Sequence, residues 1–374
     1  MKTKYFHKKN KHHVIIASAF FGKICQGGVL LICSGCAPIQ PIEDHGTVRL
    51  KPMNLQLSAA IQEKGLSMEI FTEFVVISYN SKEEMLHLLQ LIHNFPNQDM
   101  DQLTISITGV GQNSDANIWL TLSQIEATIE HHDVVDIIRQ EQFTNHMQPI
   151  VDINERIIGF EFLLRPAVGG IPFQPSSLFE VAHETGLHSF LDRTARISAI
   201  ETSAKWLPRG YKRFINFLPS SIYNPESCLT HTFETIKSLN LDPKDFVFEV
   251  VETEKIDDLP HLLDIFNIYR ENGMTVALDD VGSGYSTLEL MTTLEPDYVK
   301  IDRSIVDRCD KDPIKQYEIT RIIDAAAHFN GLVLAEGIER YEDFEFCRDA
   351  GIKFAQGYFF GKPADRPPDG IHIN

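Results

Sequence analysis

The sequence predicts an α/β protein whose second half is a TIM-like (β/α)8 barrel, preceded by a small N-terminal α/β module. From Met147 onward, apolar stretches of strand length alternate with stretches of helical spacing for more than 200 residues. This rhythm is typical of a parallel sheet, and its length favours a barrel of eight strand–helix units. No glycine-rich dinucleotide fingerprint follows an expected strand, which disfavours the alternative, an open doubly wound sheet.

Composition narrows the class of protein. The chain has 374 residues, of which 43% are hydrophobic and 23% charged, as in a soluble globular protein with two domains. The net charge of −18 argues against a protein that binds DNA or RNA polymers, because such binding needs a basic surface. A small phosphorylated ligand stays compatible, since divalent cations held by acidic residues present positive charge to a phosphate.

The first 45 residues form a basic, cysteine-containing segment. A lysine cluster precedes apolar runs at 14–21 and 29–33, and neither reaches the roughly 18 residues of a spanning helix, so we expect no membrane span. Cys33-Ser-Gly-Cys36-Ala resembles a lipoprotein cleavage box. Export or lipid anchoring is the less favoured alternative, and we expect a cytoplasmic protein.

Six cysteines, three crowded near the N-terminus and three scattered, do not suggest a disulfide scaffold in a chain of this length, which fits a reducing compartment. Cys25, Cys33 and Cys36, with His45, are of the right types for a structural zinc site. Their spacing is irregular, so the competing interpretation is that these cysteines bind nothing.

Residues 46–118 are expected to form the small α/β module. The pattern predicts strands at 46–50, 68–79 and 103–110 and helices at 55–64 and 81–92, the second opened by a Ser81–Glu84 capping box. No catalytic constellation is visible, and sensing, dimerisation and scaffolding stay open. A helical linker is expected over 119–145, with a buried stripe of Ile125, Ile129, Val134 and Ile138.

The barrel is expected over 146–374. Its expected strands are 157–164, 213–218, 246–251, 275–279, 298–301, 332–335 and 354–359. Its expected helices are 176–184, 191–205, 228–239, 259–272, 286–294, 313–330 and 341–350.

Polar side chains stand near the end of almost every expected strand. They are Glu161, Asn216, Glu249, Glu252, Asp279, Asp280, Lys300, Asp302, Glu336, Glu339 and Gln356. In a barrel such side chains converge on the C-terminal rim, where enzymes of this fold build their sites. For one acid alone a solvated or salt-bridged strand end is the favoured interpretation, but the repetition over successive strands favours a shared site.

The donor types indicate which ions the site would hold. Carboxylates with one amide, and no clustered Cys or His, suit Mg²⁺ or Mn²⁺ rather than structural zinc. Adjacent Asp279 and Asp280 would let one carboxylate bridge two ions, as two-metal phosphodiester chemistry requires.

Seven ordered motifs between Met147 and Pro363 resemble those of EAL-domain phosphodiesterases, which hydrolyse cyclic di-GMP to linear pGpG. They are EFLLR, INFLP, FEVVETE, LDDVGSGYS, DYVKIDRSIV, LAEGIE and QGYFFGKP. No diguanylate cyclase partner of the GGDEF type is apparent in the chain.

The resemblance implies a role for each matching position. It implies a first metal shell of Glu161, Asn216, Glu249 and Asp279, with Asp279 and Asp280 at a second ion. It implies that Lys300 holds the attacking water, that Glu336 is the general base, and that Glu252 braces the glycine-rich loop. Asp302 and Glu339 match further acidic positions, and Gln148, Arg165 and Gln356 match the substrate side. Whether Lys300 or Glu336 manages the proton stays open.

Some positions depart from the family pattern. Phe162 stands where the signature triplet has Ala, and strand alternation turns it away from the face of Glu161. In the loop, Val281 replaces Phe, Ser283 replaces Thr and Thr287 replaces Ser. Since all the matched ligand positions, the lysine and the general base are present, the resemblance implies an active phosphodiesterase, and it also implies a homodimer. The alternatives are a weak or inactive cyclic di-GMP receptor that signals through its N-terminal module, and a metalloenzyme acting on another phosphate ester.

Overall fold

The structure is a computed structural model that describes residues 43–95, 102–109, 118–251, 258–283 and 287–371. All of these residues belong to the larger of two compact units of the chain, Cys33–Asn374. The proposed zinc ligands Cys25, Cys33 and Cys36 lie outside the described residues, as does Glu252. No helix in the described part of the chain has both the length and the hydrophobicity needed to cross a bilayer.

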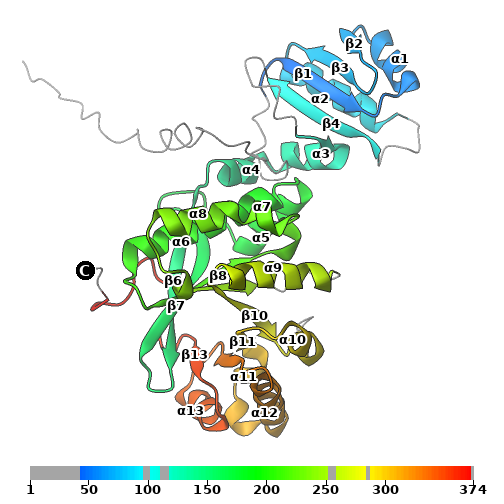
Figure 1. Cartoon of the computed structure of the whole chain (residues 1–374). Coiled ribbons are helices and arrows are strands. Elements are labelled where there is room, and N and C mark those ends of the chain that lie inside the picture. The colour runs from blue at the N-terminus through cyan, green and yellow to red at the C-terminus, as the bar shows by residue number, and fades with distance from the viewer. Residues whose placement is uncertain (1–42, 96–101, 110–117, 252–257, 284–286, 372–374) are drawn as a thin grey trace, which may run out of the picture. The chain divides into compact units, whose positions relative to one another are not determined.

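The N-terminal module is one sheet with two helices (Figure 1, blue to cyan). In chain order its elements are β1 (Gly46–Lys51), α1 (Leu55–Glu63), β2 (Met68–Ile70), β3 (Val75–Tyr79), α2 (Lys82–His93), β4 (Thr104–Gly109) and β5 (Leu120–Thr121). The sheet order is β2-β3-β1-β4-β5, and β1 pairs antiparallel with β3 and β4. Apolar side chains of both helices and the central strands form its core.

Two expectations for the module are modified by local hydrogen bonds. The predicted strand 68–79 is two antiparallel strands, β2 and β3, because the chain reverses where the Phe71 amide bonds to the Phe74 carbonyl (3.0 Å). The predicted capping box is only half formed: Ser81 accepts from the Glu84 amide (3.1 Å), but the Glu84 carboxylate accepts from the amide of Asn80 (2.6 Å), the residue before the N-cap, and not from that of Ser81.

The expected linker helix is two helices, α3 (Leu122–Glu130) and α4 (His132–Arg139), which meet at His131. Of the expected buried stripe, Ile125 and Ile138 are buried, whereas Ile129 and Val134 are only half-buried. Ile125 belongs to the core of the module, and Ile138 belongs to a separate cluster with barrel helices. Each helix therefore packs on a different core, whereas one continuous helix with a single buried face would pack on one core only.

The second half is a closed eight-stranded barrel, which confirms the predicted fold class (Figure 1). Its strands are β6 (Phe143–Asp152), β7 (Ile157–Pro166), β8 (Lys212–Phe217), β9 (Phe246–Val250), β10 (Thr275–Val281), β11 (Tyr298–Ile301), β12 (Leu332–Ala335) and β13 (Phe354–Gln356). They follow one another around the barrel in chain order, and β13 closes on β6.

The barrel departs from an all-parallel arrangement at β6. This strand is missing from the predicted set, starts three residues before the expected boundary at 146, and pairs antiparallel with both β7 and β13. Only residues 153–156 connect β6 to β7, too few for a crossover helix, so the two strands form a hairpin. Asp152 stabilises the turn by accepting from the amides of Asn154 (2.8 Å) and Arg156 (3.0 Å).

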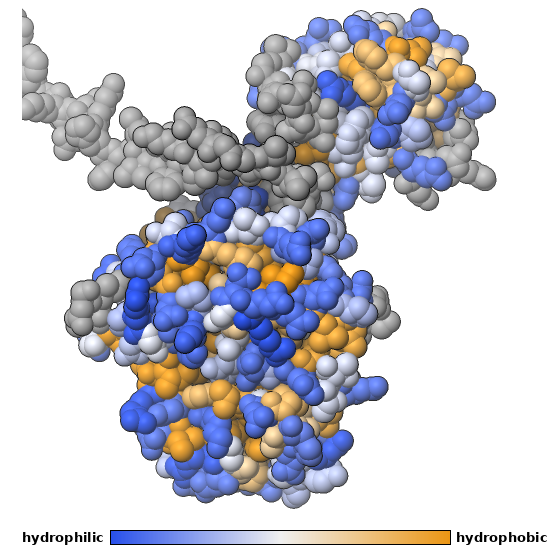
Figure 2. All heavy atoms as spheres, viewed as in Figure 1, coloured by the Kyte–Doolittle hydropathy of each residue, from blue (hydrophilic) through white to orange (hydrophobic). Residues whose placement is uncertain are grey.

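Helices surround the strands. They are α5 (Pro175–Glu184), α6 (His188–Trp206), α7 (Pro225–Cys228), α8 (Thr230–Ser238), α9 (Leu259–Glu271), α10 (Leu288–Leu294), α11 (Arg303–Val306), α12 (Pro313–Ala327) and α13 (Tyr341–Ala350), with short 3₁₀ turns η3 (Pro219–Ser221), η4 (Pro243–Asp245) and η5 (Cys309–Lys311). A small cluster containing Ile150, Phe214 and Leu334 fills the barrel interior, and a larger one lies between strands and helices. The face seen in Figure 2 mixes hydrophilic residues with apolar groups.

Candidate active site

The strand ends of the barrel bring together acids that are far apart in the sequence. Glu161 lies on β7, Glu249 on β9 and Asp279 on β10, while Glu336 directly follows β12. The Lys300 side chain, from β11, is completely buried among them. Its Nζ lies 2.7 Å from Glu336 Oε1, 2.8 Å from Asp279 Oδ1 and 3.8 Å from Glu161 Oε1. The same nitrogen also forms an ion pair with Glu249 Oε2. Four carboxylates, three on strands and one directly after a strand, therefore lie within 4.0 Å of one ammonium group.

Amide side chains hold Glu161 in place. Its Oε1 accepts from Asn216 Nδ2 (3.2 Å), and its Oε2 accepts from Gln356 Nε2 (2.6 Å). Gln148 lies opposite Glu161 in the β6–β7 pair, and paired residues point to the same face of a sheet. Gln148 is buried and donates to the Gly361 carbonyl (3.4 Å). The three amides thus join the acids at the same end of the barrel.

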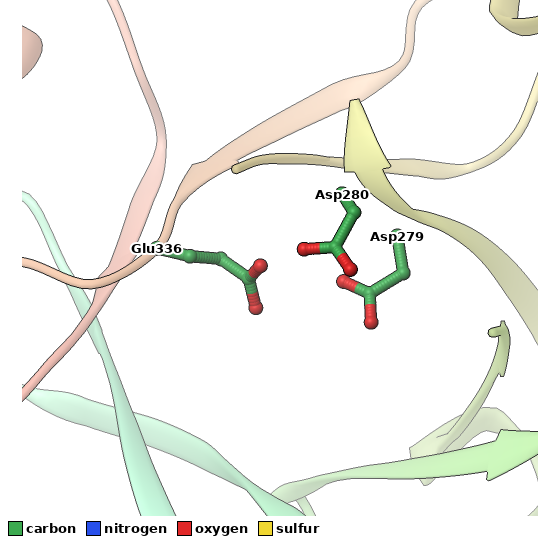
Figure 3. A group of neighbouring side chains, drawn as sticks. All are labelled: Asp279, Asp280 and Glu336. Carbon is green, nitrogen blue, oxygen red and sulfur yellow. The ribbon is translucent and has the colours of Figure 1, made fainter. Parts of the chain in front are cut away.

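A bulge lets two consecutive aspartates serve one site. Neighbouring residues of a regular strand point to opposite faces, so Asp279 and Asp280 would normally diverge. The β10–β11 register shifts between Leu278 and Val281, and Asp280 adopts a left-handed backbone with φ of 52°. As a result, carboxylate oxygens of Asp279, Asp280 and Glu336 all lie within 4.8 Å of one another (Figure 3).

The pKa values in this cluster are shifted because several buried carboxyl groups surround a single positive charge, that of Lys300. Burial raises the pKa of Glu249 well above its ordinary value, and Glu161 and Asp279 add to this shift while Lys300 opposes it. Burial and Asp279 likewise raise the pKa of Glu336, and they raise the pKa of Asp280 to about 7. Burial acts to lower the pKa of Lys300, but the surrounding carboxylates outweigh it and raise that pKa, so the lysine stays charged.

The donor set fits divalent cations of the magnesium type. Carboxylate and amide oxygens are the ligands these ions take, and Asp279, Asp280 and Glu336 are close enough to share one ion. Glu249 Oε1 is buried and lacks a hydrogen-bond partner among the described residues. A buried carboxylate oxygen is costly to leave unpaired, and a bound cation would satisfy it.

A cleft of about 850 Å³ opens beside the acids. Glu161, Asn216 and Asp279 line it, and so do Arg165 at the end of β7 and Phe179 on α5. Arg165 is half-buried and donates one hydrogen bond to the Leu164 carbonyl (2.7 Å). The remaining guanidinium donors suit a phosphate, to which arginine can give two parallel hydrogen bonds.

The other predicted residues fall into different surroundings. Asp302 accepts from the Ser304 amide (2.9 Å) at the start of α11 and contributes to the raised pKa of Asp280, so it borders the cluster. Glu339 instead pairs with Arg303 (2.8 Å), and its side chain is 41% exposed. Phe162 is buried in the core between strands and helices, as strand alternation predicts, and Val281 is buried in the same core.

Two buried polar residues of the cleft were not singled out from the sequence. Asp192 on α6 and Asn145 on β6 are both buried and line the cleft. Asp192 and Arg196 have the spacing of an ordinary surface ion pair on a helix, which conceals their burial. Asn145 lies on the strand that the pattern did not predict.

Comparisons with known proteins agree with this geometry. The EAL domain profile matches residues 131–363, and the chain belongs to the EAL-domain family. Over 229 residues the chain is 35% identical to the probable cyclic di-GMP phosphodiesterase PdeG of Escherichia coli K12, covering 58% of this chain and 43% of PdeG. It is 31% identical over 235 residues to the probable cyclic di-GMP phosphodiesterase PdeB of the same organism, covering 62% of this chain and 45% of PdeB. The chain thus spans less than half the length of either relative.

Solved structures extend the likeness to the fold. A standalone EAL protein from Vibrio cholerae O395, in its c-di-GMP bound form, is 32% identical with a TM-score of 0.55, and the match covers 60% of this chain and 94% of that one. BlrP1 from Klebsiella pneumoniae is 20% identical with a TM-score of 0.54, covering 86% of this chain and 96% of that one, and shows likeness in fold alone.

Proposed function

We propose that the EAL barrel of this chain hydrolyses cyclic di-GMP to linear pGpG with two divalent cations, Mg²⁺ or Mn²⁺. The observation that carries the proposal is the set of four carboxylates around Lys300, beside a cleft lined by Arg165. Two relatives similar to this chain are named probable cyclic di-GMP phosphodiesterases, and the similar Vibrio cholerae structure contains c-di-GMP.

We assign the ligands from the geometry and the family pattern together. Glu161, Asn216, Glu249 and Asp279 would hold one ion, and Asp279 with Asp280 would hold the other. When bound, such cations lower the pKa of the attacking water and neutralise charge on the phosphoryl oxygens. The bulge after Leu278 supports the bridging assignment, since it presents both aspartates to the same space.

Lys300 and Glu336 receive separate tasks in this proposal. Because the surrounding acids raise the pKa of Lys300, its ammonium can donate a hydrogen bond and orient the attacking water but cannot accept a proton. Glu336 Oε1 lies 2.7 Å from Lys300 Nζ, so a water held by the lysine lies within reach of this carboxylate. Bound cations would offset the burial and the Asp279 charge that raise the pKa of Glu336 in the metal-free protein, and we therefore favour Glu336 as the general base.

The substrate side rests on the cleft and on the family pattern. Arg165 lines the cleft and would bind a phosphate of the dinucleotide. Gln148 and Gln356, on the strands β6 and β13 that close the barrel, are assigned to the substrate by the family pattern alone. We propose that Glu252 braces the glycine-rich loop that follows Asp280. We also propose that Asp302 lies beside the ions. We further propose a homodimer in the bacterial cytoplasm, where cyclic di-GMP is made.

Turnover by the full chain tests the proposal. Incubation with cyclic di-GMP and Mg²⁺ or Mn²⁺, followed by chromatography, should show pGpG, and Glu161→Ala and Glu336→Ala should abolish it. Glu345→Ala is the matched control, because this acid is 51% exposed on α13 and no role in the reaction is proposed for it. Binding of cyclic di-GMP without turnover in either metal would instead identify a receptor. Turnover of another phosphate ester alone would identify a different barrel metalloenzyme.

A further inference from the structure

We propose that Asp192 is a positioning residue that fixes the metal-binding end of β8. This inference rests on the proposed function and adds to it a residue that does not touch the reacting atoms. Asp192 lies on α6, and its side chain is only 3% exposed. A carboxylate so deeply buried must be satisfied by donors from its surroundings.

Three donors converge on Asp192. Its Oδ1 accepts from the backbone amide of Leu218 (2.9 Å). Its Oδ2 accepts from Ser221 Oγ (2.6 Å) and from Arg196 Nη1 (2.8 Å). Both oxygens are therefore engaged within the protein, although the residue lines the cleft. This engagement separates Asp192 from the acids proposed to bind metal, of which Glu249 keeps a buried oxygen without a partner among the described residues.

The bonds of Asp192 control how the chain leaves β8. This strand ends at Phe217, and η3 begins at Pro219, so Leu218 is the junction between the two. Asp192 holds the junction from the Leu218 amide and holds η3 through Ser221. The proposed metal ligand Asn216 lies two residues before Leu218 and must present its amide oxygen to the ion.

The neighbours of Asn216 show what a shift would disturb. Asn216 Nδ2 donates to Glu161 Oε1 (3.2 Å), and Asn216 pairs in register with Glu249 on β9. A change in the direction of the chain after Phe217 therefore acts on three proposed ligands of one ion. Residues that orient metal ligands from behind influence affinity although they do not touch the metal.

A second buried pair provides a matched control. Asp245, 7% exposed, accepts through Oδ2 from the Gly210 amide (3.0 Å) and from Arg213 Nη1 (3.0 Å). Like Asp192, it combines a buried arginine with one backbone amide. Arg213, however, lies near the start of β8, and Asp245 directly precedes β9, so this pair sits at the opposite ends of these strands from Asn216 and Glu249.

The experiment compares Asp192→Asn with Asp245→Asn in the full chain. An amide retains the size of the carboxyl group but has only one acceptor oxygen, so it cannot accept both from the Leu218 amide on one side and from Ser221 and Arg196 on the other. Calorimetry with Mn²⁺ alone should show affinity about 10-fold weaker for Asp192→Asn and unchanged for Asp245→Asn. Hydrogen exchange in the segment 216–221 should accelerate only in Asp192→Asn. Melting temperatures should fall in both variants.

Each outcome decides the inference. Wild-type Mn²⁺ affinity and exchange in Asp192→Asn would overturn it, and so would equal losses of affinity in both variants, which would indicate general destabilisation. If Asp192→Asn does not fold, Ser221→Ala removes a single donor and should still weaken Mn²⁺ binding by a few fold; unchanged binding there would also overturn the inference. The expected Mn²⁺ and exchange results, in a protein that does not turn over cyclic di-GMP, would support the positioning role and refute the proposed function.

Discussion

Replacing Lys300 with methionine tests the electrostatic account of the site most directly. The substitution keeps most of the length of the side chain and removes its charge. Lys300 is completely buried, and its ammonium group is the cation that the four surrounding carboxylates share in the metal-free protein. Lys300→Met should therefore destabilise the metal-free barrel as well as abolish turnover.

The expected magnitude follows from the burial. Removing one partner from a buried ion pair costs about 3–5 kcal/mol, because the other charge stays buried without compensation. For a domain of this size each kcal/mol lowers the melting temperature by about 2–4 °C, so the loss should lie between roughly 6 and 20 °C. Carboxyl groups left without the ammonium have pKa values above those in the unfolded chain. The folded variant then binds more protons than the unfolded one. The loss of stability of Lys300→Met relative to the wild type should therefore grow as the pH rises from 5 to 8.

Differential scanning fluorimetry with EDTA and with Mn²⁺ provides the assay. Lys353→Met is the control, because Lys353 is exposed on the same barrel and its loss should change stability by less than about 0.5 kcal/mol. Mn²⁺ should stabilise Lys300→Met more than the wild type, since the cation enters a more negative site. A Lys300→Met protein with the wild-type melting temperature in EDTA at pH 8 would refute the electrostatic account, as would an equal Mn²⁺ increment in both proteins.

Three further predictions concern other residues of the barrel. Because burial and Asp279 raise the pKa of Asp280 to about 7, Mn²⁺ binding at pH 6 should release the proton of Asp280 and tighten as the pH rises to 7. Calorimetry in two buffers of different ionisation enthalpy measures the number of protons released, and a release that is undiminished in Asp280→Asn would contradict the assignment. Phe162→Ala should lower the free energy of unfolding by about 3–5 kcal/mol in denaturant titrations and leave Mn²⁺ affinity unchanged, since Phe162 packs in the core between the strands and the helices. Weakened Mn²⁺ binding would show that Phe162 supports the site. Glu339→Gln should cost at most about 1 kcal/mol in the same titrations, because its pair with Arg303 is exposed, and a loss of Mn²⁺ affinity would place Glu339 at the ions instead.

The parallel strands of the barrel were predictable because each is a short apolar run between helical patterns. The predicted strands at 298–301 and 332–335 coincide with β11 and β12. β6 was missed because Asn145, His146 and Gln148 interrupt its apolar pattern and Pro149 lies within it, which usually argues against a strand. Its place beside β7 and β13 is decided by the closure of the barrel, which no local pattern encodes.

The sequence contained a signal for the break between α3 and α4, namely an interruption in the spacing of the apolar residues. Val134 follows Ile129 by five positions, and a step of five positions departs from the i, i+3 and i, i+4 spacing that keeps side chains on one face of a helix. The convergence of the acids was predictable from the fold class. The bulge that turns Asp280 toward Asp279 was not, because it depends on the register between β10 and β11.

The pairing of β13 with β6 has a consequence for how the protein is made. Gln356 on the last strand donates to Glu161, 195 residues earlier, so the proposed site is completed only by the final part of the barrel. Contacts between distant residues form late and slowly during folding. A ribosome-bound chain that lacks β13 would therefore present an open sheet with an unfinished acid cluster, and a nascent chain would become competent for metal binding only after β13 has emerged.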